Sequence, residues 1–307
     1  MRSERNAMNG FSANWLHLRE PFDHVAREKV AAALDLPRRL AQWRNRSPGE
    51  SLAVIDLACG HGANLRALAP GLGGAQHWRL VDHDAALLAA VPDALAEWAR
   101  RHEYRFMREG GAGAEQAFDI AGTGFHAKVV CQRVELARDL ASLDFGEMPL
   151  VTASALLDLV SAPWLQALIH KARAARAAVL FGLTVDGRTA WSSTDPDDEL
   201  VHGLFCQHQR RDKGFGPALG SQAATVALQQ MACAGYETLQ TQTDWVIDGA
   251  LAPRMMLAMV EGMAAAALEQ NPAEQDAVRS WRARRGAGIG SSRLRVGHVD
   301  IVATPGS

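Results

Sequence analysis

Residues 52–64 read Leu-Ala-Val-Ile-Asp-Leu-Ala-Cys-Gly-His-Gly-Ala-Asn, and this stretch decides the fold. The mostly apolar run from Leu52 to Leu57 predicts a buried parallel strand. Gly60-His-Gly62 follows it, and Leu65 and Leu68 then recur on one face of a predicted helix. A strand, a glycine turn and a helix in this order bring backbone N–H groups to a ligand at the helix N-terminus. The stretch therefore predicts a site for a nucleotide-like ligand.

A second strand, predicted over residues 77–81, ends on Asp82. A carboxylate about 20 residues after the glycine turn is where a doubly wound fold holds a ribose diol. The next acid, Asp84, is the alternative if the strand ends later. Two ligands compete at this point, a dinucleotide and S-adenosylmethionine. Leu65 stands where the dinucleotide motif needs its third glycine, whereas Asp56, four residues before Gly60, favours S-adenosylmethionine.

The segment Asp56-Leu-Ala-Cys-Gly-His-Gly62 resembles the glycine motif of the class I S-adenosylmethionine-dependent methyltransferases. Ala58 replaces the first glycine of that motif, a mild departure if its φ is negative. Residues 138–145 resemble the segment that carries an acid near the adenine, here Asp139, and residues 150–160 resemble the fourth strand and the start of its helix. The resemblance implies S-adenosyl-L-methionine as cofactor, held by Asp56, Ala58, Gly60, His61, Gly62, Asn64, Asp82, His83, Asp139, Leu140 and Ser154.

The bulk composition narrows the class of protein. A net charge of −2 over 307 residues gives no reason to expect a nucleic-acid partner. The four cysteines are far apart and form no Cys-x-x-Cys pair, so we expect neither a metal site nor disulfides. No apolar stretch reaches the about 20 residues that span a bilayer. We expect a cytoplasmic protein without a membrane partner, and a homodimer stays open.

Alternating strand and helix patterns over residues 50–185 predict a parallel sheet with helices on both faces. With the resemblance, the expected fold is a three-layer, doubly wound α/β fold around a mostly parallel seven-stranded sheet. We expect a helical N-terminal extension over 1–48 and the cofactor-binding domain over 49–307, with a helical insertion before the last strand. Residues 108–124 are expected to form a loop, and residues 129–135, 236–247 and 298–303 are expected to form one strand each.

The acceptor side carries weaker signals. Asp158 follows an apolar run and is expected near the methyl group, where it could orient an amine acceptor or accept its proton. The alternative is an ordinary exposed acid at a helix start. His202 and His208 have the side chain best suited to a general base near neutral pH.

The residues that surround these histidines predict the nature of the substrate. Substrate-side segments are expected at 186–216 and 251–292, and Arg210, Arg211 and Arg285 suggest an acceptor with a carboxylate or phosphate. The alternative is a solvated basic surface. The predicted function is methyl transfer to a small molecule. The alternatives are a nucleic-acid or protein methyltransferase and a non-catalytic protein that binds the adenosyl ligand.

Overall fold

A computed structural model describes residues 13–28, 30–44, 51–109, 117–146 and 148–306. Its centre is a ten-stranded sheet with the order β3-β4-β5-β2-β1-β6-β7-β10-β8, and β9 pairs with β10. Five neighbouring strands run parallel: β5 (Phe125–Arg133), β2 (Gly74–Asp82), β1 (Leu52–Leu57), β6 (Leu150–Ser154) and β7 (Ala178–Trp191). Because all five end on the same edge, the turns that follow them lie together.

The last strand of the chain is reversed. β10 (Arg293–Pro305) lies antiparallel between β7 and β8 (Tyr236–Gln242), and its first residues also pair with β9 (Trp245–Asp248). Strands β5, β2, β1, β6, β7, β10 and β8 are therefore the predicted seven-stranded sheet, with its antiparallel pair at one edge. The other strands are additions to it.

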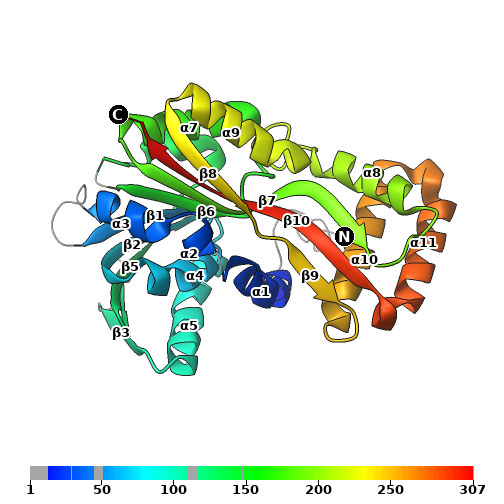
Figure 1. The fold of residues 1–307 in the computed structure, drawn as a ribbon, viewed down its shortest axis with the longest axis horizontal. Helices are drawn as coiled ribbons and strands as arrows, with labels where there is room; N and C mark the ends of the chain where they lie inside the picture. Colours follow the sequence, from blue (N-terminus) through cyan, green and yellow to red (C-terminus); the bar gives the residue numbers. More distant parts are fainter. Residues whose placement is uncertain (1–12, 29, 45–50, 110–116, 147, 307) are drawn as a thin grey trace.

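Helices cover both faces of the sheet, so the expected three layers are confirmed (Figure 1). Side chains of β1 alternate between the two faces. Ile55 and Leu57 pack with α7 (Ala162–Ala174) and α9 (Ala223–Cys233), whereas Val54 packs with α4 (Ala63–Leu72) and α5 (Ala85–Arg101). A short helix, α6 (Leu136–Asp139), follows β5.

The long strands β7 and β10 extend past the ends of the other parallel strands. A group of helices lies beside this extension: α8 (Asp198–Gln209), α10 (Pro253–Gln270) and α11 (Gln275–Ala287) (Figure 1). These helices form an apolar core of their own, with Val201 and Leu204 packed against Val260 and Met263. Helices α10 and α11 lie in the chain between β9 and β10. The expected helical insertion before the last strand is confirmed.

Three helices precede the sheet: α1 (Ala13–Arg27), α2 (Val30–Ala33) and α3 (Leu36–Arg44). Helix α1 packs against α4 and β9. A Cβ atom added to Gly60 would lie 3.6 Å from Leu16 Cδ1 of α1, and the Trp15 and Trp245 rings meet edge to face at 6.2 Å. Helix α1 therefore covers the glycine turn at the carboxyl edge of the sheet.

Some expected elements differ from the structure. The predicted loop over 108–124 contains β3 (Arg105–Glu109) and β4 (Ala117–Gly122), which pair with each other on either side of undescribed residues. Gly122 and Gly124 lie in the tight turn from β4 into β5, where Gly124 has φ +80°. That turn also starts the third strand at Phe125 rather than at residue 129.

The predicted single strand over 236–247 is two strands, β8 and β9. Thr243 and Asp244 separate the two strands, although both strands pair with β10 and the Thr243 N–H still donates to His298 O of β10. The Asp244 side chain pairs with Arg188. The final strand is longer than the predicted 298–303. Among the helices of the described ranges, none combines the length and the apolar composition that a membrane crossing requires.

Candidate functional site at the carboxyl edge of the sheet

The turn between β1 and α4 has a left-handed backbone at three positions. Gly60 has φ +56° and Gly62 has φ +82°, conformations that glycine adopts without strain. Ala58 has φ +52°, so the expectation of a mild departure from the glycine motif, which required a negative φ, is wrong. A left-handed residue with a Cβ costs about 1–2 kcal/mol. The turn stores strain beside the predicted ligand.

A chain of buried polar groups runs from this turn to the last strand. Asn64 Nδ2 donates to Asp56 Oδ1 at 2.7 Å and to Thr152 Oγ1 at 3.0 Å. Arg27 of α1 donates from Nη1 to Asn64 Oδ1 and from Nε to Asp300 Oδ2, each at 2.8 Å. Arg27 is an addition to the predicted site, brought there by a helix far from the glycine motif in sequence.

Two atoms in this series of buried polar groups remain unsatisfied. Within the part of the chain that the structure describes, neither Arg27 Nη2 nor Asp56 Oδ2 has a hydrogen-bond partner, although both are buried. Burial raises the pKa of Asp56 to about 7, against the lowering effect of the bonds from Asn64 and the charge of Arg27. A buried unpaired polar atom costs about 1–3 kcal/mol. The pair therefore offers one donor and one acceptor to a ligand.

Asp82, at the end of β2, lies beside the turn. It accepts from the Gly60 N–H at 2.8 Å and from the Asp84 N–H at 2.9 Å, and His83 Nδ1 lies 3.3 Å from its Oδ1. Each carboxylate oxygen has a second lone pair for a ligand hydroxyl. Asp84 caps α5 by accepting from the Ala86 and Leu87 N–H groups, which gives the alternative acid a structural role.

The segment after β5 is the predicted adenine side. Leu140 is buried and Asp139 is exposed at the far end of α6. The Val134 N–H donates to Asp82 O at 2.9 Å, which places the adjacent Glu135 beside the end of β2. Sequence analysis did not single out Glu135, although it follows β5 more directly than Asp139 does. Ser154 is the last residue of β6. The N–H of the following residue, Ala155, donates to Gly182 O.

His61, between the two turn glycines, is held by helix α1. Glu20 pairs with Arg66, and the His61 ring lies 3.3 Å from Arg66 and 4.0 Å from Glu20. Burial and the Arg66 charge lower the pKa of His61. The ring thus takes part in fastening α1 over the turn.

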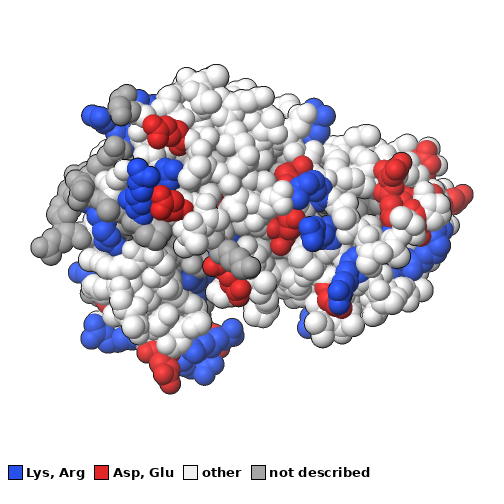
Figure 2. Space-filling view, viewed as in Figure 1, with Lys and Arg blue, Asp and Glu red and all other residues white. Residues whose placement is uncertain are grey.

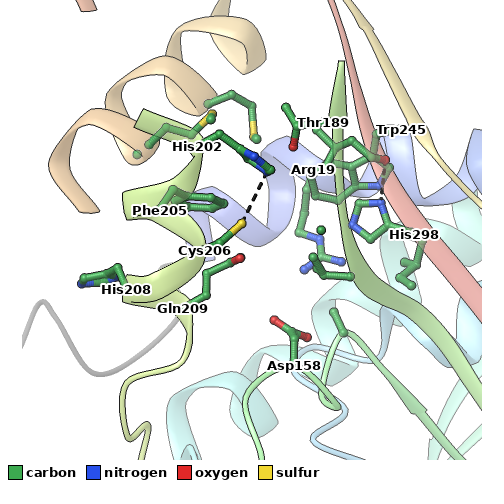
Figure 3. Close-up of a pocket in the computed structure, with 18 of the residues that line it drawn as sticks. Arg19, Asp158, Thr189, His202, Phe205, Cys206, His208, Gln209, Trp245 and His298 are labelled. Atoms are coloured by element: carbon green, nitrogen blue, oxygen red, sulfur yellow. Dashed lines mark hydrogen bonds between the residues drawn. The ribbon is translucent and has the colours of Figure 1, made fainter. Parts of the chain in front are cut away.

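A cavity of about 360 Å³ opens on the acceptor side, between α1, α8, α10 and the extended part of β7 (Figure 3). The three predicted catalytic candidates, Asp158, His202 and His208, all line it. Burial raises the pKa of Asp158 above its ordinary value. His202 Nε2 lies 3.4 Å from Cys206 Sγ, and His208 pairs with Glu269 at 3.1 Å.

Two residues of the cavity were missed by sequence analysis. Arg19 pairs with Asp23 at 2.9 Å, and its guanidinium lies 5.1 Å from the centre of the Trp245 ring. His298 packs on the other side of the Trp245 ring at 4.5 Å, and burial lowers the pKa of this histidine to about 4. Near pH 7, this part of the cavity lining therefore contains a neutral His298 and an Arg19 whose charge is paired with Asp23.

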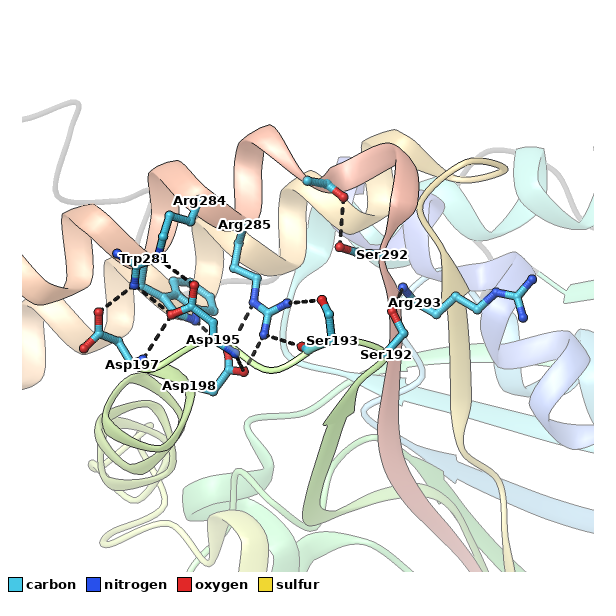
Figure 4. A network of polar contacts seen from close by, with 11 residues as sticks. Ser192, Ser193, Asp195, Asp197, Asp198, Trp281, Arg284, Arg285, Ser292 and Arg293 are labelled. Atoms are coloured by element: carbon cyan, nitrogen blue, oxygen red, sulfur yellow. Dashed lines mark hydrogen bonds and ion pairs between the residues drawn. The ribbon is translucent and has the colours of Figure 1, made fainter.

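The predicted substrate-binding arginines lie elsewhere. Arg210 is exposed, and Arg211 pairs with Glu269 and Gln270. Arg285 is buried in a network with Asp198 and Ser193, beside Arg284, which pairs with two further carboxylates (Figure 4). None of Arg210, Arg211 and Arg285 is among the described residues that line the cavity. On the face shown in Figure 2, basic and acidic side chains lie largely side by side.

Comparisons with known proteins add a likeness in shape. No family model and no curated protein matches this chain. A cyclopropane-fatty-acyl-phospholipid synthase-like protein from Lactobacillus casei is 16% identical, with 95% of this chain and 94% of that chain covered and a TM-score of 0.47. A putative sarcosine dimethylglycine methyltransferase from Galdieria sulphuraria is 11% identical, with 88% and 84% covered and a TM-score of 0.39.

These similarities are too distant to identify the protein. The fold class rests on its own strand order, with a reversed strand between β7 and β8, and on the glycine turn after β1. These features give the protein the fold of the class I S-adenosylmethionine-dependent methyltransferases. The resemblance that the sequence predicts is confirmed at the level of the fold.

Proposed function

We propose that the protein transfers a methyl group from S-adenosylmethionine to a small molecule bound in the cavity. The observation that carries the proposal is the complementary pair of unsatisfied atoms beside the glycine turn, Arg27 Nη2 and Asp56 Oδ2. The methionine end of the cofactor carries a carboxylate and an ammonium group. The carboxylate suits the arginine donor and the ammonium suits the aspartate acceptor, through charge-assisted hydrogen bonds.

The remaining parts of the cofactor fit the same edge. Asp82 would accept from the ribose hydroxyls, and the segment from Glu135 to Leu140 would lie along the adenine. The turn residues Gly60 and Gly62 allow the backbone to approach the ligand closely. When bound, S-adenosylmethionine supplies a methyl group activated by its positive sulfur.

The protein's contribution is mainly to position the acceptor. Helix α1 contributes Arg27 to the cofactor side and Trp15 and Arg19 to the cavity, so one helix spans both halves of the site. A covered cavity holds the acceptor in line with the transferred group and excludes water. Asp158 lines the cavity and would accept a proton from the acceptor.

Calorimetry and thermal unfolding test the cofactor assignment. We expect S-adenosylhomocysteine to bind and NAD not to bind. At about 100 times its dissociation constant, the ligand should stabilise the fold by about 2.7 kcal/mol. Binding of NAD in place of S-adenosylhomocysteine would contradict the assignment.

A transfer experiment tests the reaction. Labelled S-adenosylmethionine is incubated with the protein and a cell extract, and the label is followed into the small-molecule, protein and nucleic-acid fractions. We expect label in the small-molecule fraction. Label in another fraction would show a macromolecular acceptor, and cofactor binding without any transfer would show a non-catalytic adenosyl-binding protein.

A further inference from the structure

The walls of the cavity are apolar and aromatic. They include Trp15, Trp245, Phe205, Met259 and Met263. The two methionines lie one helical turn apart on α10, Met263 in the apolar cluster with α8 and Met259 in the cluster that contains Trp245. Aromatic rings and methionine side chains adapt to a flat apolar molecule, so the body of the acceptor should be apolar.

Two oxygen atoms at one end of this apolar space are unsatisfied. Asp158 Oδ1 and Gln209 Oε1 are buried, and neither finds a hydrogen-bond partner among the residues described. They come from the loop after β6 and from the last residue of α8, and Figure 3 shows both side chains directed toward the space between them. Both atoms are acceptors, so the missing partner is a hydrogen-bond donor.

Three arginine and lysine side chains line the cavity, Arg19, Arg188 and Lys213, and Lys213 places a positive charge near Asp158. Arg19 is paired with Asp23, and Arg188 is paired with Asp186 and Asp244. An acceptor with a carboxylate or phosphate would instead place its oxygens near the two unsatisfied oxygens, where like partial charges repel. The two unsatisfied oxygens therefore favour a hydrogen-bond donor over the anionic acceptor that the basic residues of the sequence suggested.

Resting on the proposed methyl transfer, we infer that the acceptor is an amine with an apolar, ring-bearing body, whose nitrogen donates to Asp158 Oδ1 and Gln209 Oε1. A hydroxyl group has a single hydrogen and can serve only one of the two oxygens, whereas an amine can serve both. Burial raises the pKa of the Asp158 carboxyl, so this group takes up a proton more readily than an exposed aspartate does.

The reaction balances with these groups alone. The bound ammonium gives one proton to Asp158, which frees the nitrogen lone pair. The nitrogen then forms a bond to the methyl carbon as the bond between that carbon and sulfur breaks. The products are a methylated ammonium and S-adenosylhomocysteine, and Asp158 later releases its proton to water.

Three probes with one body and different heads test the inference: phenethylamine, phenethyl alcohol and hydrocinnamate. Each is titrated by calorimetry into the protein loaded with S-adenosylhomocysteine, a complex in which no transfer occurs. We expect the amine to bind at least about tenfold more tightly than the alcohol, the difference of about 1.4 kcal/mol that one hydrogen bond to a charged group supplies. The carboxylate should bind most weakly.

Two variants and a matched control locate the head group. Asp158→Asn and Gln209→Leu should each weaken amine binding by about tenfold and leave hydrocinnamate binding no weaker. Gln207→Leu is the control, because Gln207 is exposed on the same helix and outside the cavity. With S-adenosylmethionine present, mass spectrometry should detect methylated phenethylamine from the wild-type protein and less of it from Asp158→Asn.

The outcomes separate this inference from the proposed function. If S-adenosylhomocysteine binds but the alcohol or the carboxylate binds as tightly as the amine, or if no probe binds, the amine assignment is overturned and the cofactor assignment stands. Equal amine affinity in Asp158→Asn, Gln209→Leu and the control would also overturn it. If S-adenosylhomocysteine does not bind, the proposed function fails first.

Discussion

Arg27 and Arg285 are both buried arginines on helices, but they differ in how fully their guanidinium groups are paired. All three nitrogens of Arg285 donate to Asp198 or Ser193, and its guanidinium lies 4.1 Å from the centre of the Trp191 ring. Arg27 donates from Nε and Nη1 only. Within the described residues, its Nη2 has no partner.

The difference separates a structural group from a binding group. The Arg285 network joins α11 to the segment before α8 and leaves no guanidinium nitrogen without a partner (Figure 4). Arg27 joins α1 to β10 and to Asn64 after the glycine turn, and it retains one unpaired donor, while Asn64 links it to Asp56, which retains one unpaired acceptor. A buried polar atom without a partner is costly, so its persistence points to a ligand.

The largest effect should come from removing the fully paired arginine. Arg285→Met leaves Asp198 without its cation, and we expect the free energy of unfolding to fall by about 3 kcal/mol, the lower end for a broken buried pair because Asp198 is partly exposed. Urea unfolding measures this. Arg282→Met on the same helix is the control, since Arg282 and Glu261 form an exposed pair worth less than about 1 kcal/mol. Equal losses in both variants would contradict the structural role of Arg285.

The second prediction concerns ligand binding, which should depend on Arg27 and not on Arg285. Arg27→Met should weaken S-adenosylhomocysteine binding by about 2 kcal/mol through loss of a charge-assisted hydrogen bond. Calorimetry is done at a temperature where circular dichroism shows that the variant is folded, because Asp300 also loses a partner. Arg285→Met, measured in the same way, should bind the ligand as the wild type does. If Arg27→Met also binds normally, its free donor does not serve the cofactor.

The third prediction uses the pKa of Asp56, which burial raises to about 7. A carboxylate binds the ligand's ammonium better than a neutral carboxyl does, so S-adenosylhomocysteine affinity should fall about tenfold from about pH 8 to about pH 6. The effect on the free protein has the opposite sign. Between the ordinary value of 3.8 and about 7 the unfolded state has lost the proton that the folded state keeps, so this group lowers stability as pH rises.

Asp56→Asn is the control for this titration. The amide has nearly the same shape and does not titrate, so its weaker binding should vary much less over the same pH range. A wild-type pH profile that persists in Asp56→Asn would assign the titration to another group, such as His61.

The sequence predicted the parts of the molecule that depend on neighbouring residues. The β1 strand, the glycine turn and Asp82 are local signals, since a buried strand, a tight turn and a strand-end acid each occupy a few consecutive positions. The mostly parallel, seven-stranded sheet was predicted from the resemblance, because the predicted elements matched the family's segments in sequence order. Strand ends were less accurate where glycines form hairpin turns, as at Gly124.

The side chains that meet across the fold could not be predicted in this way. Arg27 pairs with Asp300, 273 residues later, and nothing near either residue in sequence indicates the other. The basic run near residue 285 suggested an anion site because its partner carboxylates, Asp195 to Asp198, lie far away in sequence. A cluster of basic residues in the sequence does not reveal that carboxylates distant in sequence already pair with it.

The smallest effect concerns the strained turn beside Arg27 and Asp56. Ala58→Gly should raise the free energy of unfolding by about 0.5–1 kcal/mol, because relief of the left-handed strain outweighs the extra freedom that glycine gives the unfolded chain. Ala67→Gly, in the interior of α4, is the matched control and should lower it by about 0.5–1 kcal/mol. If Ala58→Gly is destabilised as much as Ala67→Gly, the alanine is not strained, and the turn holds its shape through the packing of α1 against it.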